Sequence, residues 1–99
     1  WASVAAGDTL GVLVVGAHTD KTVQFTKNGA FGGNMGIEGT CDPSDSARYA
    51  VLEKQDGTLI SAITDEKPRT IMQHVYRVRP TVGAGVSGVD VFVLLGSVR

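Results

Sequence analysis

Glycine spacing is the feature that most constrains what this chain can fold into. Its 13 glycines, spread over 99 residues, cut the sequence into short segments rich in Val, Ile, Thr and Phe. Short β-branched and aromatic runs between turn residues are typical of strands. Their even spacing predicts an all-β fold, an antiparallel β-sandwich of the immunoglobulin-like or jelly-roll type.

The segments predict about seven short strands. The segment 21–27, KTVQFTK, alternates most regularly, with Val23 and Phe25 on one face, as a half-buried antiparallel strand requires. Asp56-Gly57 predicts a type I′ hairpin turn, and Pro80 is expected to end the longest segment. A helix over 44–55 is the one competing interpretation. The expected strands are 9–15, 21–27, 35–40, 49–53, 58–63, 70–79 and 89–98.

Two segments carry further expectations. The apolar run 89–98, VDVFVLLGSV, predicts a central strand with both faces covered, or a strand packed against a partner. The polar stretch 41–46, CDPSDS, is expected to be a turn in which aspartate side chains cap backbone N–H groups. Ile37 is expected to anchor the strand that precedes this turn, and Tyr49 and Val51 the strand that follows it.

Composition narrows the class of protein. Hydrophobic residues make up 42% of the chain and charged residues 19%, which is typical of one globular domain over residues 1–99. Residues 1–8 are a candidate extended N-terminal arm, because their glycine and alanines allow an extended path. A net charge of −1 disfavours nucleic acid as a partner. The apolar runs are too short to span a bilayer, so we expect no membrane partner either.

Chemical motifs are weak in this sequence. The stretch 83–88, GAGVSG, matches G-x-G-x-x-G, but a β-branched run follows it where a dinucleotide site needs a helix, so a flexible hairpin loop is favoured. The two histidines and the single cysteine form no close ligand pair. Aspartates beside Cys41 would oppose a reactive thiolate. We therefore expect no catalytic residue, no metal and no cofactor, and we do not expect the protein to be an enzyme.

Four residues stand out as candidate surface contacts. Trp1 and Phe31 are large apolar side chains in segments expected to be exposed, where such groups often mark a protein contact. Phe31 could instead anchor the end of the sandwich. Arg77 and Arg79 share one face of their expected strand, either to protect a sheet edge by charge or to bind an anion or a glycan.

The order of these pieces resembles small virion-structural proteins of tailed bacteriophages, of the head decoration or cement type. The similarity runs from about Asp20 to Arg99. The matching residues are Val23-Gln24-Phe25, Gly29, Phe31 and Gly32, Ile37-Glu38-Gly39, and Val78-Arg79-Pro80. The chain departs from the family pattern at Arg77, where tyrosine is usual, at 41–45, where Asn-Asp-Gly is usual, and at Tyr49, near the usual tryptophan.

The resemblance implies a capsid decoration protein that binds the major capsid protein and stabilises the head. It also implies a homo-oligomer, made in the host bacterial cytoplasm and located on the capsid surface of the virion. The alternatives are another virion component (head fibre base, neck or tail) or a glycan-binding β-sandwich module that uses an aromatic platform of Tyr49, Tyr76 or Phe31. The candidate interface residues are Trp1, Phe31, Tyr49, Arg77 and Arg79.

Overall fold

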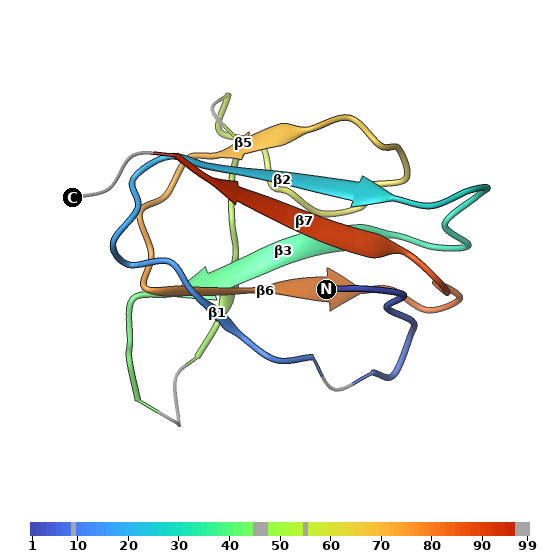
Figure 1. Cartoon of the computed structure of the whole chain (residues 1–99), viewed down its shortest axis with the longest axis horizontal. Coiled ribbons are helices and arrows are strands. Elements are labelled where there is room, and N and C mark those ends of the chain that lie inside the picture. Colours follow the sequence, from blue (N-terminus) through green and yellow to red (C-terminus); the bar gives the residue numbers. More distant parts are fainter. Residues whose placement is uncertain (9, 45–47, 55, 97–99) are drawn as a thin grey trace.

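The computed structural model describes residues 1–8, 10–44, 48–54 and 56–96. These residues form two antiparallel sheets and no helix, which confirms the predicted all-β, sandwich-like fold (Figure 1). The sheets have the strand orders β1-β6-β3-β4 and β5-β2-β7. The strands are β1 (Leu13–Val14), β2 (Lys21–Thr26), β3 (Met35–Thr40), β4 (Ala50–Val51), β5 (Arg69–Ile71), β6 (Arg77–Val82) and β7 (Asp90–Leu95).

Some sequence predictions fall partly outside the described residues. These are the start of the strand predicted over 9–15, the end of the strand predicted over 89–98, and positions 45–47 within the stretch predicted as a turn or a helix. In the described residues 48–54 the chain forms β4 and no helix. Val51 of that strand is 36% exposed, whereas its neighbour Leu52 is 4% exposed, so Leu52 is the anchor and the prediction for Val51 was wrong.

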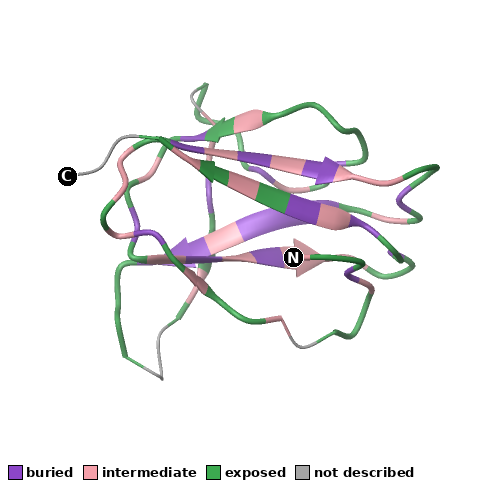
Figure 2. Cartoon of the chain, viewed as in Figure 1, coloured by how far each residue is buried: buried purple, intermediate pink, exposed green. Residues whose placement is uncertain are grey.

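Strand β2 shows the predicted alternation. Val23 and Phe25 are fully buried, and the alternate residues Thr22, Gln24 and Thr26 are partly exposed (Figure 2). Lys21 continues the buried row, and its Nζ atom donates to the Thr19 carbonyl at 3.4 Å. The strand lies between β5 and β7, so its backbone is paired on both sides. A period of two over six residues was enough to place each side chain on its face.

Pro80 does not end a strand, as the sequence had suggested, but lies inside β6 opposite Ile37 of β3. The N–H and C=O groups of Ile37 bond in the other direction, to Ile60 and Leu52, at 3.1 and 3.0 Å. Pro80 therefore faces Ile37 at a position where no ladder bond is needed. On its other side, β1 pairs with β6 only at Val78 and Arg77. The missing N–H of proline is thus tolerated within the strand.

The segment predicted as one strand over 70–79 is broken into β5 and β6, which belong to different sheets. The buried residues here are Ile71, Val75 and Val78, and their spacing of four and then three does not fit a period of two. The segment 58–63 is likewise no continuous strand: it forms single bridges from Leu59 and Ile63. The chain therefore crosses between sheets at 72–76.

The Asp56-Gly57 turn forms, but it is not of the predicted type I′. Gly57 has a positive φ of 84°, whereas Asp56 is not among the residues with positive φ. The Gly57 N–H donates to the Lys54 carbonyl at 2.9 Å, and the Asp56 carboxylate accepts the Thr58 N–H at 3.0 Å. The aspartate thus contributes through its side chain and not through a left-handed backbone.

The first residues of the chain lie along β7 and do not extend as an arm. Trp1 and Val91 exchange both backbone hydrogen bonds, at 2.8 and 2.7 Å, and Val4 and Val89 do the same at 2.8 and 3.2 Å. Ala2 and Ser3 oppose Asp90 alone, which makes a β-bulge. Ser3 takes a φ of 49° there, and its N–H donates to the Asp90 carboxylate at 2.8 Å. The expectation of an arm was wrong because this segment bonds to a sheet edge.

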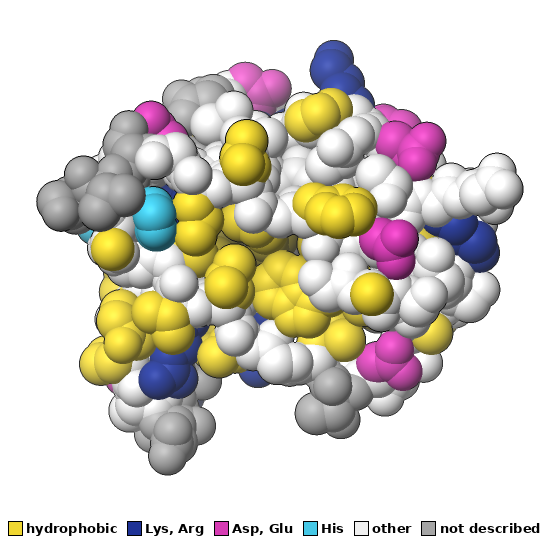
Figure 3. Space-filling view, in the orientation of Figure 1, with side chains coloured by type: hydrophobic (Ala, Val, Ile, Leu, Met, Phe, Trp, Pro, Cys, Tyr) yellow, Lys and Arg dark blue, Asp and Glu magenta, His cyan; other side chains and the backbone are white. Residues whose placement is uncertain are grey.

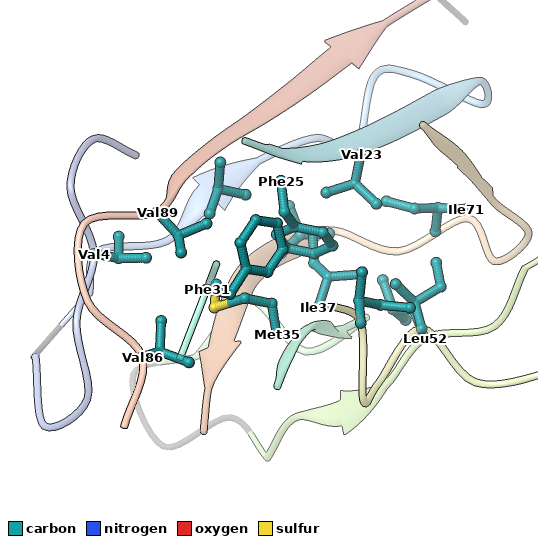
Figure 4. Packing of buried hydrophobic residues seen from close by; sticks show 14 of the residues in the cluster. Val4, Val23, Phe25, Phe31, Met35, Ile37, Leu52, Ile71, Val86 and Val89 are labelled. Carbon is teal, nitrogen blue, oxygen red and sulfur yellow. The ribbon is translucent and has the colours of Figure 1, made fainter. Parts of the chain in front are cut away.

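Side chains from both sheets fill one core, in which Phe25, Phe31, Met35 and Ile37 lie close together (Figure 4). Phe31 is 3% exposed, so the expectation that it lies on the surface was wrong and the alternative of a core anchor fits. The buried hydrophobic residues are Val4, Val15, Val23, Phe25, Phe31, Met35, Ile37, Leu52, Ile60, Ile63, Ile71, Val75, Val78, Val86, Val89 and Val91.

Two glycine turns meet beside Phe31. A Cβ atom on Gly32 would lie 2.4 Å from the Gly85 carbonyl oxygen, and one on Gly85 would lie 2.7 Å from the Gly32 carbonyl oxygen. Both residues have positive φ, 85° and 87°. The stretch 83–88 is thus a connection from β6 to β7, between the two sheets, whose close packing needs glycine; the prediction of a flexible hairpin loop was wrong.

We predict that Gly32→Ala destabilises the fold by more than Gly7→Ala. Both positions have φ of 85°, but Gly7 has no atom within 4 Å of its Cβ position. Gly7→Ala should cost about 1–2 kcal/mol of unfolding free energy for the left-handed backbone alone. Gly32→Ala adds a clash with backbone, so its loss should exceed that of Gly7→Ala by at least about 1 kcal/mol. Urea unfolding of both variants measures the difference, and equal losses would contradict the close contact.

Candidate interaction surface

Exposed apolar side chains gather on the face that carries β7, β1 and the first residue (Figure 3). Phe92 and Leu94 of β7 point outward, because successive side chains of a strand lie on opposite faces and Val91 is buried in the core. We call the following set the apolar face: Trp1, Val12, Phe92 and Leu94. Three of its members are exposed by 43% (Val12), 58% (Phe92) and 74% (Leu94). A group of exposed apolar side chains often marks a protein contact.

Trp1, Val12 and Phe92 of the apolar face line a shallow hollow of about 370 Å³ between β7 and β1, together with Leu13, Val91 and Val93. Trp1 lies beside it, partly buried against the core, and its indole N–H donates to the Gly11 carbonyl at 2.9 Å. The indole is therefore held in one place with an apolar side toward the hollow. Trp1 is the one predicted interface residue on this face.

The other members of the apolar face were missed at the sequence level. The run over 89–98 was predicted to be a central strand with both faces covered, or a strand packed against a partner. Since β7 is at the edge of a three-stranded sheet, the first alternative was wrong and the second stays a prediction. Phe92 and Leu94 lie opposite Gln24 and Thr22 of β2, on the sheet surface that faces away from the core. The polar residues Gln24 and Thr22 could have indicated that Phe92 and Leu94 face solvent, since cross-strand neighbours share a face.

Tyr49 and Arg79 lie together on the opposite sheet, as two of the predicted interface residues. The Arg79 guanidinium carbon lies 3.7 Å from the centre of the Tyr49 ring, within cation–π range. The guanidinium also donates to the Glu38 carboxylate, its neighbour across the β3–β6 ladder. The side chains of Arg79 and Glu38 are 39% and 20% exposed. This cluster satisfies its own charges and fixes the ring of Tyr49.

Arg77 binds the polar loop that follows β3. It lies opposite Thr40, the last residue of that strand, and it donates to the carbonyls of Pro43 and Ser44 at 2.6 and 3.5 Å. The Asp42 carboxylate accepts the Ser44 N–H at 2.9 Å, and chiefly this bond lowers the pKa of Asp42, with the nearby Arg77 charge as a smaller cause. The predicted capping by aspartate is thus confirmed at Asp42; position 45 lies outside the described residues.

The structure therefore separates the predicted interface residues into different places. Trp1 is on the apolar face, Phe31 is in the core, and the other three lie on or beside β6, engaged in internal contacts. The two arginines do share the outer face of β6, as predicted. Because β1 pairs with β6 at Arg77 and Val78, Arg77 does not protect an edge; Arg79 lies beyond this pairing, and for it the suggestion stays a prediction.

The aromatic platform that a glycan site would need is not assembled among the described residues. Phe31 is buried, and the Arg79 guanidinium covers one side of the Tyr49 ring. Tyr76 is 36% exposed, with the Arg77 guanidinium carbon 5.4 Å from its ring centre. No observation therefore favours the glycan-binding alternative.

Other candidate groups are dispersed. The described residues contain no cluster of three or more His, Cys, Asp or Glu side chains that could hold a metal ion. Cys41 is exposed, and its sulfur lies 3.8 Å from the His74 carbonyl oxygen. His74 contacts the Gly16 carbonyl through its ring at 2.9 Å. Nowhere in the described parts of the chain is there a helix long and apolar enough to cross a membrane.

Comparisons with known proteins identify no relative, so the surface described above is the main evidence on function. No protein-family model matches the chain, and no match is found among curated proteins or solved structures.

We predict that Tyr49 and Arg79 are energetically coupled. A double-mutant cycle with Tyr49→Ala and Arg79→Ala should give a coupling free energy of about 0.5–1 kcal/mol, because the guanidinium stacks on the ring at a partly exposed site. The matched control is the Tyr76 and Arg77 pair, whose separation of 5.4 Å should give a smaller value. Thermal unfolding of the variants in each cycle measures both, and equal couplings would contradict the stacked geometry.

Proposed function

We propose that this protein is a bacteriophage capsid decoration protein that binds the major capsid protein and stabilises the head. The observation that carries the proposal is the apolar face, which places large apolar side chains in solvent on one side of a β-sandwich. The partner is named from the ordered sequence motifs that resemble virion-structural proteins of tailed phages. A place on the capsid surface and synthesis in the host bacterial cytoplasm belong to the same proposal.

The apolar face supplies the kind of contact that such a role requires. Phe92 and Leu94 are more than half exposed, so a partner surface can still remove most of their area from water. Full burial of one such side chain stabilises a contact by about 1.5–3 kcal/mol. Much of that gain offsets the cost of association, so a single face should bind weakly. A capsid lattice presents many equivalent sites, and an oligomeric decoration protein would bind them with avidity.

The candidate residues on the two sheets make different kinds of contact. Arg77 and Arg79 make internal bonds that hold the loop after β3 and the Tyr49 ring. Trp1 lines the hollow of the apolar face. We therefore assign the capsid contact to the β7 side, with Trp1 as the retained candidate from the sequence, and not to the arginines.

Cosedimentation with capsids that lack the protein tests the proposal. The protein should bind saturably, at a fixed ratio to the capsid subunit. Phe92→Lys should weaken this binding by tenfold or more, as roughly one buried aromatic contact is lost. Leu59→Lys is the matched control: Leu59 is 54% exposed, against 58% for Phe92, and it lies beside Glu53, away from β7.

Two results would contradict the proposal. Absence of saturable binding to capsids would remove the decoration role. Equal weakening by Phe92→Lys and Leu59→Lys would remove the apolar face as the contact. Imaging of virions that carry the protein separates the head from a head fibre base, neck or tail, and density only at one of the latter would favour the other virion role.

A further inference from the structure

The connection from β2 to β3, residues 27–34, lies at one end of the sandwich and is anchored at two points (Figure 1). The Lys27 N–H donates to the Glu66 carboxylate at 3.1 Å, and its Nζ atom donates to the Ser87 hydroxyl at 3.4 Å. Phe31 is buried in the core, and its carbonyl accepts the Ser87 N–H at 3.3 Å. The residues between these anchors are exposed, and no hydrogen bond joins them to any other described residue. They are therefore the least restrained part of the connection.

This free stretch begins with Asn28 and Gly29, a pair that can react within itself. The backbone nitrogen after an asparagine can bond to the side-chain amide carbon, which is one reason why asparagine is thermolabile. Gly29 leaves that nitrogen accessible, since a Cβ atom placed on it would meet no atom within 4 Å. Its φ of 119° also favours glycine. Asn28 thus holds an electrophilic carbon beside an unshielded nucleophile, and attack within one chain gains from this proximity.

Asn34 is the other asparagine of the chain, and it differs from Asn28 in its hydrogen bonds. Both residues are exposed. The nitrogen that follows Asn34, that of Met35, donates its hydrogen to the Ile63 carbonyl at 2.9 Å, and the Met35 side chain is buried. The Asn34 carbonyl also accepts the Gly83 N–H at 2.8 Å. Attack at Asn34 requires these bonds to break, so hydrogen bonding, and not exposure, distinguishes the two sites.

We propose that Asn28 is a site of spontaneous deamidation in the folded protein. The Gly29 nitrogen bonds to the side-chain carbonyl carbon of Asn28, and its proton leaves with the amide nitrogen as ammonia. Water then opens the resulting cyclic imide. Breaking of the bond from the Gly29 nitrogen to the side-chain carbon gives aspartate. Breaking of the bond to the main-chain carbon gives isoaspartate, in which the backbone runs through the former side chain. Water is the only co-reactant.

Isoaspartate lengthens the backbone by one methylene group shortly before a closely packed contact. Phe31 is buried, and a Cβ atom on the following Gly32 would lie 2.4 Å from the Gly85 carbonyl oxygen. Such close packing tolerates little displacement. Extra backbone length at position 28 should therefore loosen Phe31 and Gly32 against the connection from β6 to β7.

Both products also add a negative charge. Asn28 lines a shallow hollow of about 350 Å³ together with Thr26, Lys27, Glu66 and Asp90. A carboxylate at position 28 lies near those of Glu66 and Asp90, and like charges repel. Lys27 is the cation among the residues that line the hollow and offsets part of this repulsion. The net charge of −1 becomes one unit more negative, so anion exchange separates the products from the unmodified protein.

Incubation of the folded protein at near-neutral pH, followed by mass spectrometry of its peptides, tests the site. Aspartate and isoaspartate should accumulate at position 28, and Asn34 should convert more slowly by about tenfold or more. Methylation by a protein isoaspartate methyltransferase identifies the isoaspartate. Unfolding in denaturant should raise the rate at Asn34 by a larger factor than at Asn28, because it breaks the Met35 hydrogen bond.

Two variants test the chemistry at this site. Asn28→Gln moves the amide carbon one methylene group further from the Gly29 nitrogen, and it should give no isoaspartate at position 28. Gly29→Ala shields that nitrogen and should slow the reaction about tenfold or more. Circular dichroism shows whether each variant is folded; Asn28→Gln and the comparison with Asn34 carry the test if Gly29→Ala is not.

Urea unfolding separates the effect of the charge from that of the longer backbone. Asn28→Asp is the matched control, because it carries the added charge on an unchanged backbone. Its unfolding midpoint should lie below that of the unmodified protein, since like charges then meet in the hollow. The purified isoaspartate form should unfold at a still lower urea concentration.

The outcomes separate this inference from the capsid proposal. Absence of isoaspartate at position 28, equal rates at Asn28 and Asn34, or an unchanged rate in a folded Gly29→Ala protein overturns the site. An isoaspartate form as stable as Asn28→Asp overturns its effect on the packing of Phe31. No capsid takes part in these measurements, so a failure of capsid binding leaves the deamidation intact, and the reverse also holds.

Discussion

The burial of Phe25 and Phe31 between the two sheets is the interaction on which the rest of the structure depends. Phe25 comes from β2, at the centre of one sheet, and Phe31 lies in the connection that leads to β3, in the other sheet. The chain must therefore turn from one layer to the next within a few residues. It does so through Gly32, whose backbone lies against Gly85 in the connection from β6 to β7. Two of the crossings between the sheets, from β2 to β3 and from β6 to β7, thus meet at one glycine contact beside one aromatic ring.

The parts of the fold that follow a strict period of two could be predicted from the sequence. Strands β2 and β3 were placed within a residue of their bounds, and Val23, Phe25 and Ile37 are buried as expected. Burial alternates strictly only in β2, because the glycines of β3 are buried as well. In such strands the alternation of side chains contains the burial pattern directly. The turn chemistry of Asp42 was also predictable, because an aspartate side chain bonds its own nearby backbone and needs no tertiary contact.

The remaining features depend on neighbours that no local pattern contains. The break between β5 and β6 follows from a change of sheet, and a strand-forming composition over 70–79 does not reveal where the chain leaves one layer. Phe31 was expected in solvent because glycines surround it, yet those glycines are what allow the ring to turn inward. The position of β7 at an edge is a property of sheet order, which an apolar run does not encode.

Strand β7 shows how one misjudged position changes the interpretation of the surface. In a central strand, both faces of a run such as VFVLL would be covered by other parts of the domain. Its apolar side chains would then need no partner outside the domain. At an edge, the same run leaves Phe92 and Leu94 in solvent, on the sheet surface that faces away from the core. The Trp1–Val4 segment pairs with Val91 and Val89 of this strand and brings an indole to the hollow. Trp1 therefore shapes this surface through its backbone bonds to Val91 as well as through its ring.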